Sequence, residues 1–119
     1  MDQTFLSFCT VVVNPGEQVK VSTHEYARLT ITSASIVYKD DLPKQGRVVL
    51  YVSAYDSNGD IGQKIAIAPL RVCDCEVVTL DLETFSPLLF STEGSEISVT
   101  ISGYTDTPEP LIVDRIKKE

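Results

Sequence analysis

The sequence contains no tryptophan, a single histidine and few basic residues, and each scarcity narrows the range of possible functions. Its 119 residues carry 10 Lys or Arg against 17 Asp or Glu, for a net charge of −7. The imbalance is concentrated in residues 61–114, where only Lys64 and Arg71 are basic. Because nucleic acids are bound through clustered lysine and arginine, this composition argues against direct nucleic-acid binding and fits a basic partner. Solubility alone is the alternative explanation of the charge.

Catalytic and metal chemistry find as little support. His24 is the only histidine, and no nucleophile motif surrounds any serine or cysteine. A zinc site needs four ligands, and only Cys9 and His24 could join the pair Cys73 and Cys75. An odd number of cysteines without repeated spacing is typical of reduced thiols in a cytosolic or nuclear protein. We therefore predict a protein that is not an enzyme, with no catalytic residue, no metal site and no cofactor.

Long apolar runs are absent as well. No run approaches the roughly 18–20 residues that span a bilayer. The first apolar stretch, residues 5–13, follows Asp2 without a basic segment, which is typical of a β-strand and not of a signal peptide. We predict no membrane association.

What the sequence does contain is the pattern of an all-β protein, with short apolar runs, no sustained helical period and turn residues at short intervals. The clearest signal is residues 47–70, two β-type runs joined by residues 56–60. Within this turn Asn58-Gly59 favours a hairpin, because both residue types tolerate positive φ. Further strands are expected at residues 5–13, 18–22, 26–37, 76–82, 88–91 and 96–102.

Eight strands in one domain of this length favour a jelly roll. An immunoglobulin-like sandwich or a small barrel is the alternative, and the lack of tryptophan weakens the first of these. We predict an all-β, eight-stranded antiparallel jelly-roll sandwich or barrel over residues 1–104. Residues 105–119 are expected to form an extended C-terminal tail that leads into a further region, with a short contact at residues 111–113.

The first arm of the hairpin is apolar on both of its faces. Alternate residues of a strand point to opposite sides, which separates two sets of residues: Val48, Leu50, Val52 and Ala54 on one face, and Val49, Tyr51 and Tyr55 on the other. A single sheet over one core should be polar outside, so the second face is expected to meet protein too. We predict that Val49, Tyr51 and Tyr55 form a contact between protomers. Packing under a loop or under the tail is the alternative.

Several short sequence motifs, in the order in which they occur, resemble the core domain of the nucleoplasmin family over residues 4–104. These motifs are Phe5-Leu6-Ser7-Phe8-Cys9, Asn14-Pro15-Gly16, His24-Glu25-Tyr26-Ala27-Arg28-Leu29-Thr30-Ile31, Tyr38-Lys39-Asp40-Asp41, and residues 93–103 (EGSEISVTISG). The chain departs from the family pattern at Phe8, where the family usually has glycine. It also lacks the family's acidic tract, since no more than two acidic residues are adjacent.

The resemblance implies an eight-stranded jelly roll that assembles into a ring of five protomers, two of which stack into a decamer in some members. The loop of Tyr38, Lys39, Asp40 and Asp41 matches the one that contributes to stacking. The resemblance further implies a histone chaperone of the nucleus or nucleolus, with the cytosol as second choice. Basic histones would then meet an acidic surface, for which the candidates are Asp74, Glu76, Asp81, Glu83, Glu93 and Glu96.

A second hypothesis needs no histone. The same pattern of strands is typical of self-assembling scaffolds, such as capsid-like jelly rolls, and of modules that bind another protein. These would form shells, filaments or complexes with a different protein in place of closed five-fold rings.

Overall fold

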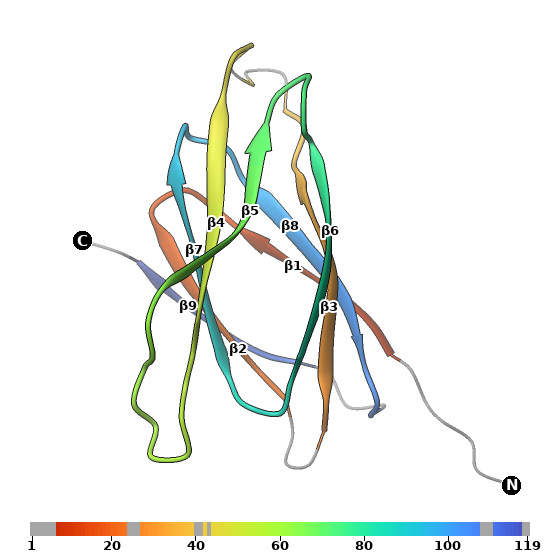
Figure 1. The fold of residues 1–119 in the computed structure, drawn as a ribbon, viewed down its shortest axis with the longest axis vertical. Helices are drawn as coiled ribbons and strands as arrows, with labels where there is room; N and C mark the ends of the chain where they lie inside the picture. Colours follow the sequence, from red (N-terminus) through yellow and green to blue (C-terminus); the bar gives the residue numbers. More distant parts are fainter. Residues whose placement is uncertain (1–6, 24–26, 40–41, 43, 108–110, 118–119) are drawn as a thin grey trace, which may run out of the picture.

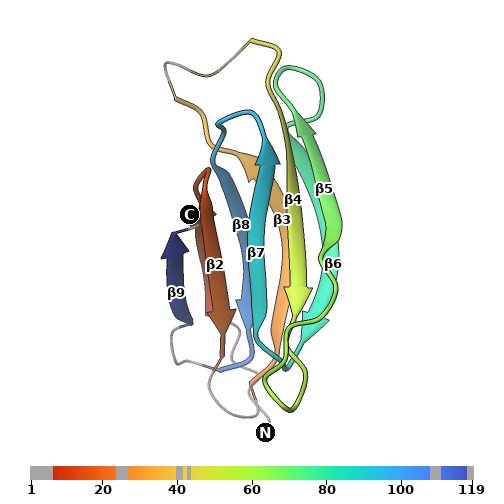
Figure 2. The same ribbon diagram turned by 90° about the vertical axis from the view of Figure 1, so that its left-hand side faces the viewer.

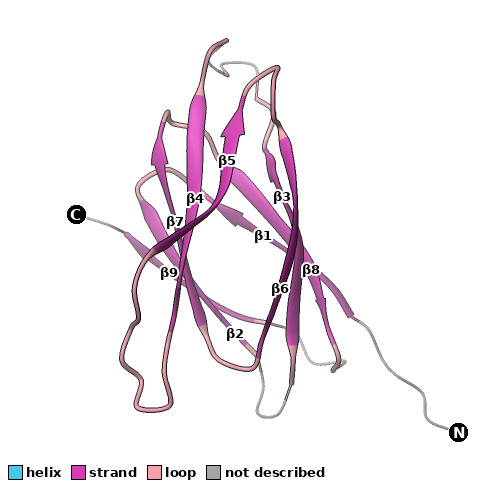
Figure 3. Ribbon diagram, in the orientation of Figure 1, coloured by secondary structure: helices cyan, strands magenta, loops and turns pink. Residues whose placement is uncertain are grey.

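The computed structural model describes residues 7–23, 27–39, 42, 44–107 and 111–117, and all regular elements in these ranges are β-strands (Figures 1 and 3). No helix long and apolar enough to cross a membrane occurs within these ranges. The strands are β1 (Ser7–Val13), β2 (Glu17–Ser22), β3 (Leu29–Ile36), β4 (Arg47–Ala54), β5 (Ile65–Arg71), β6 (Val77–Thr84), β7 (Leu88–Gly94), β8 (Val99–Thr105) and β9 (Ile112–Lys117).

The strands form two antiparallel sheets that pack face to face as a sandwich (Figure 1). One sheet has the order β1-β8-β3-β6, and the other has the order β5-β4-β7-β2-β9. Successive strands mostly alternate between the two sheets, which is the connectivity of a jelly roll. The predicted all-β jelly-roll sandwich is therefore confirmed, and the described residues form one strand more than the sequence suggested.

The core lies between the sheets and follows from the period-two alternation of the strands. In β8, Val99 and Ile101 point inward and are no more than 2% exposed. Across the sandwich, β4 contributes Leu50 and β7 contributes Phe90, both fully buried. The expected inward face of β4 is confirmed for Val48, Leu50 and Val52, whereas Ala54 at the strand end is exposed.

The hairpin at residues 47–70 is present, with a longer connection than expected. The turn at residues 56–60 is closed by the Asp56 side chain, whose Oδ1 accepts the backbone N–H groups of Asn58 and Asp60, both at 2.9 Å. Of the pair Asn58-Gly59, only Gly59 has positive φ (83°). Regular pairing resumes only at Ile65, because residues 61–64 still belong to the connection.

The strand expected at residues 96–102 begins and ends three residues later, as β8. Gly103 continues the strand instead of ending it. β3 has an irregularity between Ile31 and Ser33 opposite this point, and a Cβ on Gly103 would overlap the carbonyl oxygen of Thr30. The glycine therefore lets two neighbouring backbones approach closely.

The segment expected to be a tail contains β9. This strand pairs antiparallel with β2 over six residue pairs, from Glu17–Lys117 to Ser22–Ile112. It extends the five-stranded sheet beyond β2, which would otherwise be the edge (Figure 2).

Candidate protein-interaction surfaces

The outer face of β4 is partly covered within the protomer. Val49, Tyr51 and Tyr55 are all half-buried. The Nζ atom of Lys64 lies 4.4 Å from the centre of the Tyr51 ring, and Nζ of Lys20 lies 4.6 Å from that of Tyr55. Each lysine is thus placed for a cation–π interaction with its tyrosine.

These lysine–tyrosine pairs lie on a face whose central residues are shielded from solvent. Ser53, Leu89 and Ser91 point to the outer side, yet each is less than 9% exposed. Lys64 also forms an ion pair of 2.6 Å with Glu93 on β7. The face predicted to be apolar is therefore a mixed surface, with aromatic rings under ammonium groups.

The loop predicted to stack rings lies at one end of the sandwich. Tyr38 and Lys39 are exposed, while Asp40 and Asp41 lie outside the described residues. The Tyr38 hydroxyl is hydrogen-bonded to the carboxylate of Glu76, and this bond raises the pKa of Tyr38 to about 12. The same bond, together with the Cys73 backbone N–H that donates to Glu76 Oε2 at 2.8 Å, lowers the pKa of Glu76. Glu76 thus ties the loop after β3 to the turn between β5 and β6.

That turn also contains Cys73 and Cys75, the two cysteines considered above as possible zinc ligands. The backbone N–H of Arg71 donates to the Cys75 carbonyl at 2.7 Å, and Cys73 has a φ of 66°, so the chain reverses here. Both thiols are exposed. Cys9 on β1 is half-buried, and burial raises the pKa of its thiol. Within the described ranges, no group of three or more potential ligands could hold a metal ion.

A hollow at the same end carries positive charge, which the acidic composition did not suggest. It has a volume of about 240 Å³, and Lys44, Arg47, Arg71 and Asp74 are among its lining residues. Arg71 and Asp74 form an exposed ion pair of 3.8 Å. Together with Tyr38, Lys39 and Glu76, this end of the molecule presents charges of both signs.

The acidic candidates are spread over three segments of the chain. Asp74 and Glu76 lie in the turn before β6, Asp81 and Glu83 lie on the outward side of β6, and Glu93 and Glu96 lie where β7 leads into β8. All are exposed except Glu76, which is half-buried. Three of them face cations: Asp74 pairs with Arg71, Glu93 with Lys64, and Glu83 with Arg28 at 3.9 Å.

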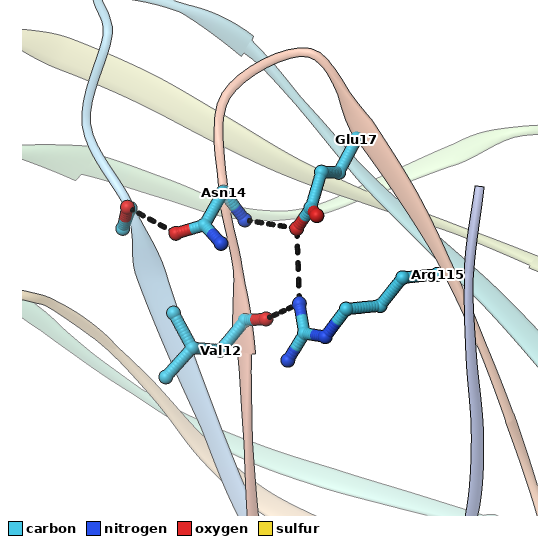
Figure 4. Close-up of polar contacts among 5 residues, drawn as sticks. Val12, Asn14, Glu17 and Arg115 are labelled. Carbon is cyan, nitrogen blue, oxygen red and sulfur yellow. Dashed lines mark hydrogen bonds and ion pairs between the residues drawn. The ribbon is translucent and has the colours of Figure 1, made fainter. Parts of the chain in front are cut away.

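A polar cluster that sequence reasoning missed fastens β9 to the rest of the sandwich (Figure 4). Nη1 of Arg115 donates to the Val12 carbonyl at 2.7 Å and to Glu17 Oε1 at 2.9 Å. Glu17 Oε1 also accepts the Asn14 backbone N–H, and Asn14 Oδ1 accepts the Ser98 hydroxyl at 2.8 Å. One arginine therefore links β9 to both sheets. The sequence offered no signal, because Arg115 lies in a charged segment far from its partners.

Comparison with known proteins agrees with this fold. The model of the nucleoplasmin-like domain matches residues 8–106. A search of curated protein sequences found no match.

Solved structures of two Drosophila proteins are similar to this chain. The first is the core of NLP, in a study of its pentamer formation and histone binding, with a TM-score of 0.69, 19% identity and coverage of 85% of this chain and 99% of that one. The second is the nucleoplasmin-like N-terminal domain of FKBP39, with a TM-score of 0.64, 18% identity and coverage of 92% and 98%. At such identities the likeness shows the fold.

The match of the family model is the stronger finding, since it extends over most of the chain and over strands β2 to β8 in full. The family is one of chaperones and scaffolds and is not a known enzyme family. The resemblance seen in the sequence is confirmed: the chain belongs to the nucleoplasmin-like domain family.

Proposed function

We propose that this chain is the ring-forming core of a nuclear histone chaperone and that it has no catalytic activity. The observation that carries the proposal is the family match over residues 8–106, supported by the likeness to the Drosophila NLP core. The net charge of −7 fits a basic partner. Pentamer formation and histone binding are named for that Drosophila protein, and we extend both to this chain. A nuclear or nucleolar location follows from such a partner, with the cytosol as second choice.

The proposed contact between protomers includes Val49, Tyr51 and Tyr55. Their half-buried state supports this, because tyrosines that are partly covered and still reach the surface suit an interface. Lys64 and Lys20 hold the two rings in place before assembly, which lowers the side-chain entropy lost on binding.

The proposed stacking surface is the loop of Tyr38, Lys39, Asp40 and Asp41. Face-to-face stacking of two identical rings uses the same surface on both partners, so that surface must complement itself. The mixed charges at this end of the sandwich, including Arg47, support such pairing.

The proposed histone-binding surface comprises Asp74, Glu76, Asp81, Glu83, Glu93 and Glu96. Five of the six are exposed. A ring repeats each carboxylate in every protomer, so a basic chain would meet several copies and gain from multivalency. Electrostatic attraction of this kind is weakened by salt.

Two measurements test the proposal. Light scattering at micromolar concentration is expected to give the mass of five chains, and a monomer would contradict the ring. Purified core histones are expected to bind at low salt and to be released as salt rises, and an absence of binding at low salt would contradict the chaperone role.

A pair of matched variants locates the histone surface. Glu96→Gln removes one of the proposed carboxylates, whereas Asp60→Asn removes the same charge from an exposed turn elsewhere. The first variant is expected to weaken histone binding several-fold more than the second, measured on rings of unchanged mass. Equal weakening would show that only net charge matters.

A further inference from the structure

The exposed large apolar side chains lie on two opposite sides of the protomer. The sheet orders place β5 and β6 at one side and β1 and β9 at the other. Figure 2 shows β5 and β6 on the right and β9 on the left. The β5–β6 side carries Ile65 of β5 and Val77 of β6, with Ile61 before β5 and Phe85 directly after β6, and the β1–β9 side carries Phe8 of β1 and Ile112, Val113 and Ile116 of β9. One further exposed aromatic, Tyr38, lies at the end of the sandwich.

Two different apolar sides are what a closed ring of identical copies requires. In such a ring each copy uses one surface toward its neighbour on one side and another surface toward its neighbour on the other. A lone protomer would leave both sides in water, and exposed apolar surface of this kind marks an interaction site.

β9 supplies most of the second side. Residues 112–117 lie beyond residues 8–106, the part that matches the family model, so this strand is an addition to the matched domain. Ile112 and Ile116 stand opposite Ser22 and Gln18 of β2 and therefore share the outer face of the sheet. The Arg115 side chain, on the alternate face, holds the strand in place from the inner side.

Strand pairing between copies is disfavoured on the β5 side. Pro69 of the edge strand β5 has no backbone N–H to donate, and a proline in an edge strand protects it against pairing with another chain. At β5 the contact is therefore made by side chains and does not continue the five-stranded sheet from one copy into the next.

We propose that β9 completes the subunit contact: Ile112 and Ile116 of one copy pack against the side of the next copy that carries Ile65 and Phe85. The proposal rests on the ring proposed above and assigns its second surface to a strand outside the matched domain.

Two double variants each remove apolar side chains from one of the two sides. Ile112→Ser with Ile116→Ser alters the β9 side, and Ile65→Ser with Phe85→Ser alters the β5–β6 side. Each is expected to lose the ring mass, in light scattering, at a concentration at which the wild type keeps it. Asn58→Ser, which changes an exposed side chain of the turn at residues 56–60 and belongs to neither side, is the control and is expected to keep the ring.

Mixing the two double variants gives the sharpest test. The variant altered at Ile65 and Phe85 keeps its β9 side, which can bind the intact β5–β6 side of the variant altered at Ile112 and Ile116. The two surfaces left free in such a pair are both the altered ones, so no third chain can add. Equal amounts are therefore expected to form heterodimers that grow no further, detected by native mass spectrometry. Failure of the mixture to form any dimer would contradict the pairing.

Crosslinking provides a second measurement that does not depend on weakened variants. Cysteines replace Ile65 and Ile116 in a chain whose three native cysteines are serine, and a short bis-maleimide is added to the assembled protein. Covalent products of up to five chains are expected, whereas either cysteine alone should give almost none. If the double-cysteine chain forms the ring but gives no such products, the role of β9 is overturned and the ring itself stands. The same conclusion follows if the Ile112→Ser and Ile116→Ser ring resists dilution as well as the wild type does. A monomeric wild type overturns both.

Discussion

β8 and β6 have the same alternation of apolar and polar residues but differ in how deeply they are buried. In β8 the inward residues Val99 and Ile101 are no more than 2% exposed, whereas in β6 the inward Leu80 and Leu82 are only half-buried. β8 lies between β1 and β3, while β6 pairs with β3 alone. The alternation thus decides which face of a strand turns inward, and the neighbours decide how much water that face loses.

The edge strands depend more on polar contacts near their ends. β9 is fastened by Arg115, and β6 is preceded by Glu76, which ties its turn to Tyr38. Burial of apolar side chains is the larger contribution to stability, and exposed polar contacts contribute about 1 kcal/mol or less each. The centre and the edges should therefore respond differently to substitution.

Truncation of the core-facing side chains should show the largest difference. Ile101→Ala is expected to lower the free energy of unfolding by about 2–5 kcal/mol, because it leaves a cavity in the fully buried centre. Leu80→Ala should cost about 1 kcal/mol, since part of that side chain is already in water. Urea unfolding at one fixed protein concentration measures both. Equal losses would mean that β6 is buried as deeply as β8 in the assembled protein.

The close approach of β8 to β3 gives a second difference. Gly103→Ala places a Cβ against the Thr30 carbonyl oxygen, and we expect a loss of about 1–3 kcal/mol as the two backbones move apart. Gly59→Ala is the matched control at an edge: its φ of 83° disfavours a side chain, but nothing lies within 4 Å of the added atom. The control should lose about 1 kcal/mol. A Gly103 variant as stable as the wild type would contradict the backbone contact.

The contacts of Arg115, which fasten β9, should contribute less to stability. Arg115→Ala removes donors to the Val12 carbonyl and to Glu17, and we expect a loss of about 1 kcal/mol because the guanidinium is partly exposed. Hydrogen exchange should become faster in β9 and stay unchanged in β8. Arg115→Lys keeps the charge without the planar group, so it should restore only part of the protection. Unchanged exchange in β9 would show that pairing with β2 suffices.

The sequence predicted the parts of the fold that depend on neighbours along the chain. Period-two alternation gave the inward residues Val48, Leu50 and Val52 of β4, and the turn at residues 56–60 was found from Asn58-Gly59. The contacts of Lys64 with Tyr51 and of Arg115 with Val12 could not be predicted, because they depend on which strands become neighbours in space. For the same reason β9 was expected to be a tail: only the exposed edge of β2 makes that segment a strand.

The hydrogen bond between Tyr38 and Glu76, beside β6, is expected to have the smallest effect on stability. This effect depends on pH, because both groups titrate. The pKa of Glu76 is below its ordinary value, so its contribution is present above about pH 4.5 and is lost as the pH falls through the lowered pKa. The contribution of Tyr38 to stability depends on pH in the opposite direction. The pKa of Tyr38 is raised to about 12, so this contribution is complete below pH 10 and is lost as the pH rises through about 12. Tyr38→Phe should move the pKa of Glu76 up toward its ordinary value but not fully, since the Cys73 N–H still donates to the carboxylate. Carboxyl-carbon NMR titration of Glu76 in the wild type and in the Tyr38→Phe variant measures this shift. Identical titration of Glu76 in both proteins would mean that the loop after β3 is not held by this hydrogen bond, and that edge strand β6 relies on its pairing with β3 alone.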